Sequence, residues 1–176
     1  IEARRAQSFQ FETLALGPVL EEALSGFLVP AETHRLITRI PDDLPSIRAD
    51  RAKFQQTLLN LLSNARKFSP RGGDIELDVL TEHPDGLALV GIAVRDHGIG
   101  MSAEDAAHAF DRFFRSDRSG HIPGTGLGLP LVKEIMKLHG GSVSLESTAD
   151  VGTCATLWFP VAVQGKAVAT TGGAVM

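Results

Sequence analysis

The spacing of apolar and polar residues predicts a chain in which short strands and helices follow one another. Strands are predicted at 9–16, 34–40, 47–49, 75–80, 87–95, 142–146 and 154–159. Helices are predicted at 18–34, 51–69, 102–114 and 128–138, where periodicity, capping residues or stop signals mark their extent. Pro30 would kink the far end of the first helix. The pattern therefore predicts a mixture of helix and strand throughout residues 9–159.

The connections between these segments indicate how they assemble. The turn Pro84-Asp85-Gly86 joins two strands into an antiparallel pair, and a turn near 150–152 lies between the last two strands. Hairpins are commoner here than alternating strand–helix units. We therefore expect an α+β fold, with a mixed, mostly antiparallel sheet and its helices on one face. A doubly wound parallel sheet is not expected.

Length and composition narrow the class of protein. A chain of 176 residues suits one domain with a real core, and a net charge of -4 gives no basic surface for nucleic acid or membrane. The longest apolar run, 87–94, is far short of the roughly 20 residues that span a bilayer. The single Cys154 is expected to be a buried strand residue, which favours a reducing, cytoplasmic compartment. The histidines are scattered, without metal-ligand spacing.

The helix 51–69 carries an unusual second face. Asn60, Asn64 and Lys67 recur at helical steps beside the stripe expected to face the core. Asparagine is a mediocre helix former, and amide oxygens can ligate Mg²⁺ while a lysine meets phosphate charge. A solvated helix face is the competing interpretation. The core stripe consists of Phe54, Leu58, Leu61, Ala65 and Phe68.

A carboxylate and two glycines follow the strand 87–95. Asp96 at the strand end could accept a hydrogen bond from an exocyclic amine such as adenine N6, while Gly98 and Gly100 let backbone approach a ligand. An ordinary Asx turn is the alternative. With Ala103 the glycines also match a dinucleotide fingerprint, but no second parallel strand with a terminal acid follows, so we reject that interpretation.

A third segment places Gly124, Gly126 and Gly128 directly before a helix. Alternate glycines let successive N–H groups converge on phosphate oxygens, and the helix N-terminus adds a favourable dipole. The alternative is a flexible loop–helix junction that binds no ligand. A P-loop is excluded, because Gly165-Lys166 is followed by Ala167 rather than Ser or Thr.

Taken in order, these segments resemble the motif boxes of the catalytic, ATP-binding domain of sensor histidine kinases. The similar stretches are 54–70 for the N box, 96–101 for the first glycine box, 110–115 for the F box and 124–129 for the second glycine box. The resemblance covers 9–162, which would be the ATP-binding domain. Residues 1–8 would end an upstream dimerisation and phosphoacceptor hairpin, and 163–176 would be a disordered tail.

The resemblance implies a Bergerat-type two-layer α/β sandwich that binds ATP and Mg²⁺. Asp96 would read the adenine amine, and Asn64 with help from Asn60 would ligate Mg²⁺. Lys67 would contact phosphate and Arg115 would approach the terminal phosphate. A lid at about 101–126, anchored by Phe110 and Phe113, would close over the nucleotide. The other nucleotide contacts would be Gly98, Gly100, Phe114, Gly124, Thr125, Gly126, Leu127, Gly128 and Leu129.

One departure from the family pattern shapes the expected activity. The acceptor histidine of the family precedes an acidic residue, and no histidine here does so. We therefore expect a monomer that binds ATP and phosphorylates only a hairpin supplied in trans, with a response regulator reached through the longer parent. Whether that parent is anchored in a membrane stays open.

Three alternatives to a histidine kinase are possible, and the sequence disfavours each of them. ATPases of the same superfamily, such as type II topoisomerases, heat-shock chaperones and mismatch-repair proteins, carry a water-activating Glu where this chain has Asn60, which cannot act as a base. A degenerate module that only docks partners is disfavoured, because every expected motif position is filled. A serine kinase acting on anti-sigma partners is disfavoured by the hairpin remnant at 1–8.

Overall fold

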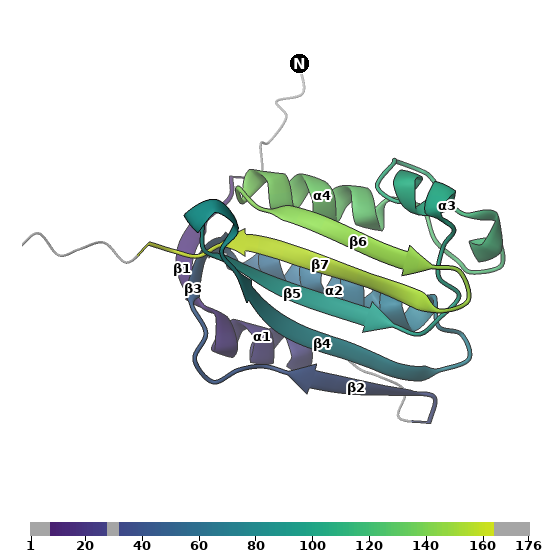
Figure 1. Ribbon diagram of the computed structural model, residues 1–176, viewed down its shortest axis with the longest axis horizontal. Helices are drawn as coiled ribbons and strands as arrows, with labels where there is room; N and C mark the ends of the chain where they lie inside the picture. Colours follow the sequence, from purple (N-terminus) through teal and green to yellow (C-terminus); the bar gives the residue numbers. More distant parts are fainter. Residues whose placement is uncertain (1–7, 28–31, 164–176) are drawn as a thin grey trace, which may run out of the picture.

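A five-stranded sheet organises the computed structural model, which describes residues 8–27 and 32–163. Its strand order is β2-β4-β5-β7-β6, and only the β2–β4 pair is parallel. The predicted mixed, mostly antiparallel sheet is therefore confirmed (Figure 1). The strands are β2 (His34–Arg39), β4 (Gly73–Glu82), β5 (Leu89–Asp96), β6 (Ser142–Thr148) and β7 (Gly152–Pro160).

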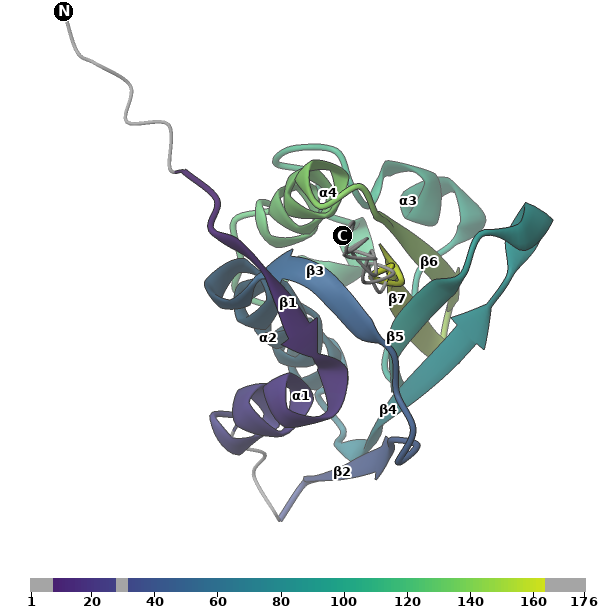
Figure 2. The ribbon, with the colours of Figure 1, turned by 90° about the vertical axis from the view of Figure 1, so that its left-hand side faces the viewer.

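Three helices cover one face of this sheet, as the two views at right angles show (Figures 1 and 2). They are α1 (Leu16–Ser25), α2 (Arg51–Lys67) and α4 (Gly128–Leu138), and the shorter α3 (Ala103–His108) lies beside β6. Two 3₁₀ turns complete the set, η1 (Pro84–Gly86) and η2 (Asp117–Ser119). No helix in the described ranges is long and apolar enough to cross a membrane.

The core lies between the helix layer and the inner face of the sheet. Apolar side chains from α2 pack against alternate residues of β4, β5 and β7, as the two periodicities predict. Burial of this surface supplies the main driving force for folding. The largest fully buried side chains are Phe54, Phe159, Leu14, Leu16, Leu20, Ile47, Leu58, Leu62, Ile75, Leu77, Ile92 and Met136.

Two predicted strands form a separate small sheet, which the sequence did not predict. β1 (Phe11–Ala15) pairs antiparallel with β3 (Ser46–Asp50). Each runs without a loop into a helix, α1 or α2, and so stays with the helix layer. The end of the described chain also reaches β3, because Val161 bridges Ile47 and the Ala162 N–H donates to the Ser46 carbonyl.

Two predicted helices are shorter than their patterns indicate. The first was expected to reach His34 but ends at Ser25, and His34 instead pairs with Gly73 at the start of the parallel ladder. The helix predicted at 102–114 ends at His108, because the chain then turns so that Phe113 N–H donates to the Gly126 carbonyl. The Pro30 kink, residues 1–7 and the tail from 164 lie outside the described residues.

Asp50 caps α2 and joins three parts of the chain. Its carboxylate accepts the Lys53 N–H at 3.0 Å and the Gln10 N–H at 2.8 Å. Its own N–H donates to Nε2 of His139 at 3.0 Å, so the hydrogen of that imidazole is on Nδ1, which donates to the Ile135 carbonyl at 2.8 Å. The cap therefore ties the start of α2 to the incoming chain and to the end of α4.

Candidate functional site

A cavity of about 350 Å³ opens between α2, the end of β5 and the segment that leads into α4. The three candidate segments of the sequence, far apart along the chain, all contribute to its wall. Three segments supply these wall residues: Asn60, Asn64 and Lys67 from α2, Asp96 and Gly100 from the end of β5 and its turn, and Gly124, Thr125, Gly126 and Gly128 from the approach to α4. The sequence therefore identified the main walls of one site.

The asparagine face of α2 is directed at the glycine segment before α4. A Cβ added to Gly128 would lie 3.1 Å from Oδ1 of Asn60 and 4.0 Å from Nδ2 of Asn64. A Cβ on Gly124 would lie 3.0 Å from Nζ of Lys67. The amides and the ammonium group are thus half-buried beside backbone that lacks side chains, rather than spread on a solvated helix face.

Asp96 is the buried acid of the site. Its side chain is 6% exposed, and its carboxylate accepts the Gly98 N–H at 2.9 Å. Burial raises the pKa of Asp96, and the hydrogen bonds from the Gly98 and Thr153 backbone offset this only in part. A carboxylate held in a cavity with its remaining acceptor capacity free is suited to bind a ligand donor.

Gly98 packs against the end of α2 and does not line the cavity, whereas Gly100 does line it. A Cβ at Gly98 would lie 1.9 Å from the Phe68 carbonyl oxygen, which accepts the Ile99 N–H at 2.9 Å. The turn after β5 is therefore pressed against the end of α2. The predicted nucleotide contact at Gly98 stays a prediction.

The segment 101–126, predicted as a lid, forms one wall of the cavity through residues such as Phe114 and Arg115. Arg115 Nη2 donates to the Ser119 carbonyl at 3.1 Å and to the Ile122 carbonyl, both within the same segment. The predicted contact of Arg115 with a terminal phosphate stays a prediction, and it requires the guanidinium to exchange these partners.

The same segment is fastened to its surroundings at several points. Arg118 pairs with Asp150 in the β6–β7 turn, and Arg112 pairs with Glu134 of α4 at 2.5 Å. The predicted anchoring by aromatic side chains is only partly seen. The ring of Phe110 lies 5.7 Å from Nζ of Lys133, whereas the side chain of Phe113 is 72% exposed and its backbone N–H donates to the Gly126 carbonyl.

The second glycine segment leads into α4 with its N-terminus open. Leu127, the N-cap residue, makes no side-chain capping bond, and Pro130 occupies the first turn, where it removes one unpaired N–H. Such a helix start, next to the backbone of Gly124 to Gly128, is suited to bind an anion. Thr125 and Leu129 line the cavity, whereas Leu127 does not and is 39% exposed. Their nucleotide contacts stay predictions.

The apolar floor of the cavity was not predicted from the sequence. Thr153 lies opposite Asp96 in the β5–β7 register, and Leu145 comes from the neighbouring strand β6. Only strand register could have placed these residues, and the sequence does not specify it. The apolar lining includes Leu61, Ala65, Val94, Ile99, Leu145 and Ala155.

Comparison with known proteins places this site in a family. The family described as "Histidine kinase-, DNA gyrase B-, and HSP90-like ATPase" matches residues 49–163. The chain is 33% identical over 160 residues to the sensor histidine kinase WalK of Bacillus subtilis, covering 88% of this chain and 26% of that protein. It is 37% identical over 164 residues to the non-motile and phage-resistance protein of Caulobacter vibrioides, covering 92% of this chain and 19% of that one.

Solved structures share the fold. The mycobacterial sensor histidine kinase MprB superposes with a TM-score of 0.71 at 23% identity, covering 88% of this chain and 98% of that one. Full-length ShkA, solved in complex with AMPPNP, gives a TM-score of 0.70 at 24% identity, covering 89% of this chain and 33% of that one. The chain thus spans about a quarter or less of the two curated relatives described above.

Proposed function

Because this chain belongs to the histidine kinase-, DNA gyrase B- and HSP90-like ATPase family, we propose that its cavity binds Mg·ATP for a sensor protein-histidine kinase. The domain would donate the γ-phosphoryl group of ATP to a histidine on a separate helical hairpin. The observation that carries the proposal is the cavity itself, which unites an amide face, a buried acid and a glycine-rich helix start.

The groups that line the cavity match the parts of the nucleotide. The Asp96 carboxylate would accept a hydrogen bond from the 6-amino group of adenine, and the apolar floor would contact the adenine ring. Lys67 and the N–H groups before α4 would meet the phosphates. In the transfer, the imidazole nitrogen attacks the γ-phosphorus, the new P–N bond forms as the P–O bond to ADP breaks, and ADP carries away the electron pair.

The α2 amides suit a magnesium ion that arrives with ATP. No group of three or more His, Cys, Asp and Glu in the described ranges could hold a metal by itself. Neutral amide oxygens on Asn60 and Asn64 would complete the coordination of an ion already bound by phosphate. Bound there, the ion would neutralise charge that develops during transfer.

The charge of the cavity favours transfer to a histidine over hydrolysis. Among the described residues that line it, Asp96 is the one carboxylate, and it lies at the end of β5 rather than on α2. None of these lining residues therefore places a carboxylate beside Asn60 to activate water. An imidazole acceptor needs no such base, because its nitrogen is itself the nucleophile.

The domain boundaries and partners belong to the same proposal. Residues 1–8 would be the end of the upstream hairpin, 9–162 would be the ATP-binding domain, and about 101–126 would be its lid, with the chain alone as a monomer. Exposed apolar side chains beside the cavity mouth support docking of a helical hairpin. They are Phe113, Leu127 and Leu131, at 72%, 39% and 37% exposure, while a response regulator would act through the longer parent.

The test begins with calorimetric titration of the chain with Mg²⁺ and a non-hydrolysable ATP analogue. Asp96→Asn should weaken binding about ten- to a hundredfold, since it removes a charged hydrogen bond to the base. Labelled ATP and a separately prepared acceptor hairpin should then give acid-labile phosphorylation of the hairpin, and a hairpin without its histidine is the control. Binding without any transfer would contradict the kinase assignment, and absence of binding would contradict the ATP site.

A further inference from the structure

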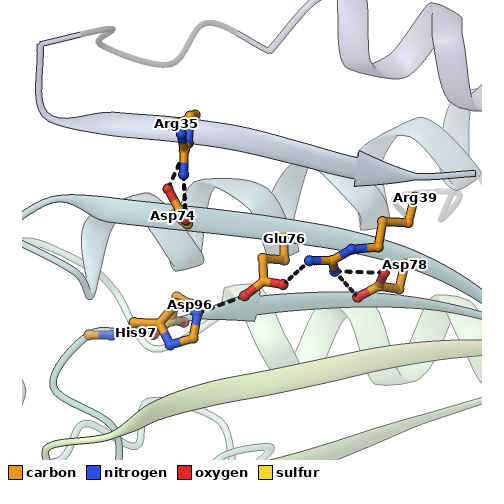
Figure 3. A network of polar contacts seen from close by, with 8 residues as sticks. Arg35, Arg39, Asp74, Glu76, Asp78, Asp96 and His97 are labelled. Atoms are coloured by element: carbon orange, nitrogen blue, oxygen red, sulfur yellow. Dashed lines mark hydrogen bonds and ion pairs between the residues drawn. The ribbon is translucent and has the colours of Figure 1, made fainter.

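Behind the cavity wall, on the outer face of the sheet, a carboxylate is held from two sides (Figure 3). Glu76 of β4 accepts from His97 Nε2 through Oε1 at 2.7 Å and from Arg39 Nη2 through Oε2 at 2.7 Å. Hydrogen bonds from His97 and Arg39 hold the pKa of Glu76 below its ordinary value. Glu76 is therefore an ionised acceptor with both oxygens bound, and it links β2 to the turn after β5.

His97 occupies a point where the backbone pairing of β5 changes. On the β7 side the pairing continues to Asp96, which lies opposite Thr153. On the β4 side it stops one residue earlier, at the Arg95 to Glu76 pair. The bond from His97 to Glu76 thus continues, through side chains, the attachment of β5 to β4 beyond its last ladder pair.

The pleat of the strand couples this bond to the cavity. Successive side chains of a strand point to opposite faces, so Asp96 faces the helix layer while Arg95 and His97 face outward. Asp96 also closes a tight turn by accepting the Gly98 N–H, with His97 as the residue in between. A rotation of the backbone at His97 would therefore turn the Asp96 carboxylate as well.

We infer that His97 is a positioning residue: its bond to Glu76, which Arg39 holds from β2, fixes the direction in which Asp96 presents its carboxylate to adenine. The inference rests on the proposed ATP site. It does not require His97 to touch the nucleotide, and it predicts an effect confined to the group on the base that Asp96 would recognise.

The experiment compares two nucleotides on the 176-residue chain in the presence of Mg²⁺. ATP carries the 6-amino group, and purine riboside triphosphate lacks it. His97→Ala should weaken ATP binding about three- to tenfold, the scale of one imperfectly made hydrogen bond, while binding of the analogue changes by less than about twofold. A general loosening of the fold would instead weaken both nucleotides together.

Two matched variants sharpen the test. The amide nitrogen of Gln reaches about as far as Nε2 of histidine, so His97→Gln should restore the preference for ATP, whereas the shorter His97→Asn should not. Arg35→Gln is the control, because Arg35 forms a bidentate pair with Asp74 at 3.0 Å on the same face of the sheet, while these two hydrogen bonds involve neither Glu76 nor His97 (Figure 3). This control should bind both nucleotides as the unchanged chain does.

The outcomes distinguish a failure of the role of His97 from a failure of the contact between Asp96 and adenine. A preference for ATP that persists in His97→Ala, or an equal loss for both nucleotides, would overturn the role of His97 and leave the ATP site intact. If the unchanged chain binds ATP no better than the analogue, the reading of adenine by Asp96 fails, and the role of His97 fails with it.

Discussion

At the scale of single residues, the proposed contact of the buried Asp96 with adenine should make nucleotide binding sensitive to pH. Its pKa lies above the ordinary value because burial disfavours the charged form, so it takes up a proton at higher pH than an exposed aspartate would. The protonated acid loses acceptor capacity for an amine. ATP affinity should therefore fall as the pH is lowered from neutral through this raised pKa.

The measurement is a set of ATP titrations over that pH range on the chain and on Asp96→Asn. The phosphates of ATP also titrate, but they do so equally for both proteins, so the difference between the two curves isolates Asp96. The curves should converge in acid, where Asp96 is neutral. Parallel curves at all pH values would contradict the prediction.

Gly98 is a second residue whose neighbours allow a sharp expectation. In Gly98→Ala the new methyl group would lie 1.9 Å from the carbonyl oxygen of Phe68. Because that oxygen belongs to the backbone and cannot rotate away as a side chain could, the turn must move away from α2. We expect a loss of about 1–3 kcal/mol in the free energy of unfolding, as for other overpacked sites. Denaturant unfolding measures it. Gly17→Ala is the control, since a Cβ there meets nothing within 4 Å, and it should not destabilise the protein.

At the scale of elements, the cap of α2 should contribute measurably to stability. Asp50→Ala removes the acceptor for the Lys53 and Gln10 N–H groups, and the loss should be about 1–2 kcal/mol. Ser102→Ala, at the cap of the short α3, should cost less, because α3 has no buried residue. Chemical denaturation of both variants provides the comparison, and equal losses would argue against a central role for Asp50.

The Asp50 cap also has a defined pH dependence. Burial acts to raise the pKa of Asp50, but the N–H groups of Gln10, Lys53 and Ala52 outweigh it, so the pKa is lowered on folding. The contribution of the charge is thus complete above the ordinary aspartate pKa and is lost as the pH falls through the lower, folded value. The stability difference between the chain and Asp50→Asn should shrink only in that acidic range.

Elements fixed by local signals were predicted well, and those decided by distant contacts were not. The helix predicted at 51–69 is found at Arg51–Lys67, because Asp50 caps it and Pro70 to Gly73 stop it. The helix predicted at 102–114 failed because Phe113 pairs with Gly126 across the chain. No local pattern specifies such a contact, or the pairing of β1 with β3.

The residues of the candidate site show the same contrast between local signals and distant contacts. Asn64 and Asp96 were predicted because their residue type is unusual for their place in a helix or at a strand end. Thr153 and Leu145 are ordinary strand residues, and they reach the cavity only through the register of β5, β7 and β6. Gly98 was predicted as a ligand contact because a glycine after a strand end lets backbone approach a ligand. Its packing against the Phe68 carbonyl could not be predicted, because no local pattern places these two segments side by side.

At the scale of the whole molecule, the apolar surface at the cavity mouth should govern transfer to a hairpin. Leu131→Ser and Phe113→Ser should raise the KM for the hairpin about tenfold or more, the scale expected when one buried apolar side chain is lost. Affinity for ATP should not change, because neither side chain lines the cavity. Leu87→Ser is the control, since Leu87 is 56% exposed and follows η1, at the end of the sheet away from α3 (Figure 1). Unchanged KM values would place the docking surface elsewhere.

Both ends of the described chain reach the same strand, since Phe11 pairs with Asp50 and Val161 bridges Ile47. A linker of about six to ten residues would join residues 8 and 163, with new termini opened at the exposed turn η1, to give a circular permutant. Such a protein should keep its affinity for ATP, because every segment of the cavity stays intact. The order of the motif boxes along the chain would then not be a requirement of the chemistry, and only their meeting place in space would be one.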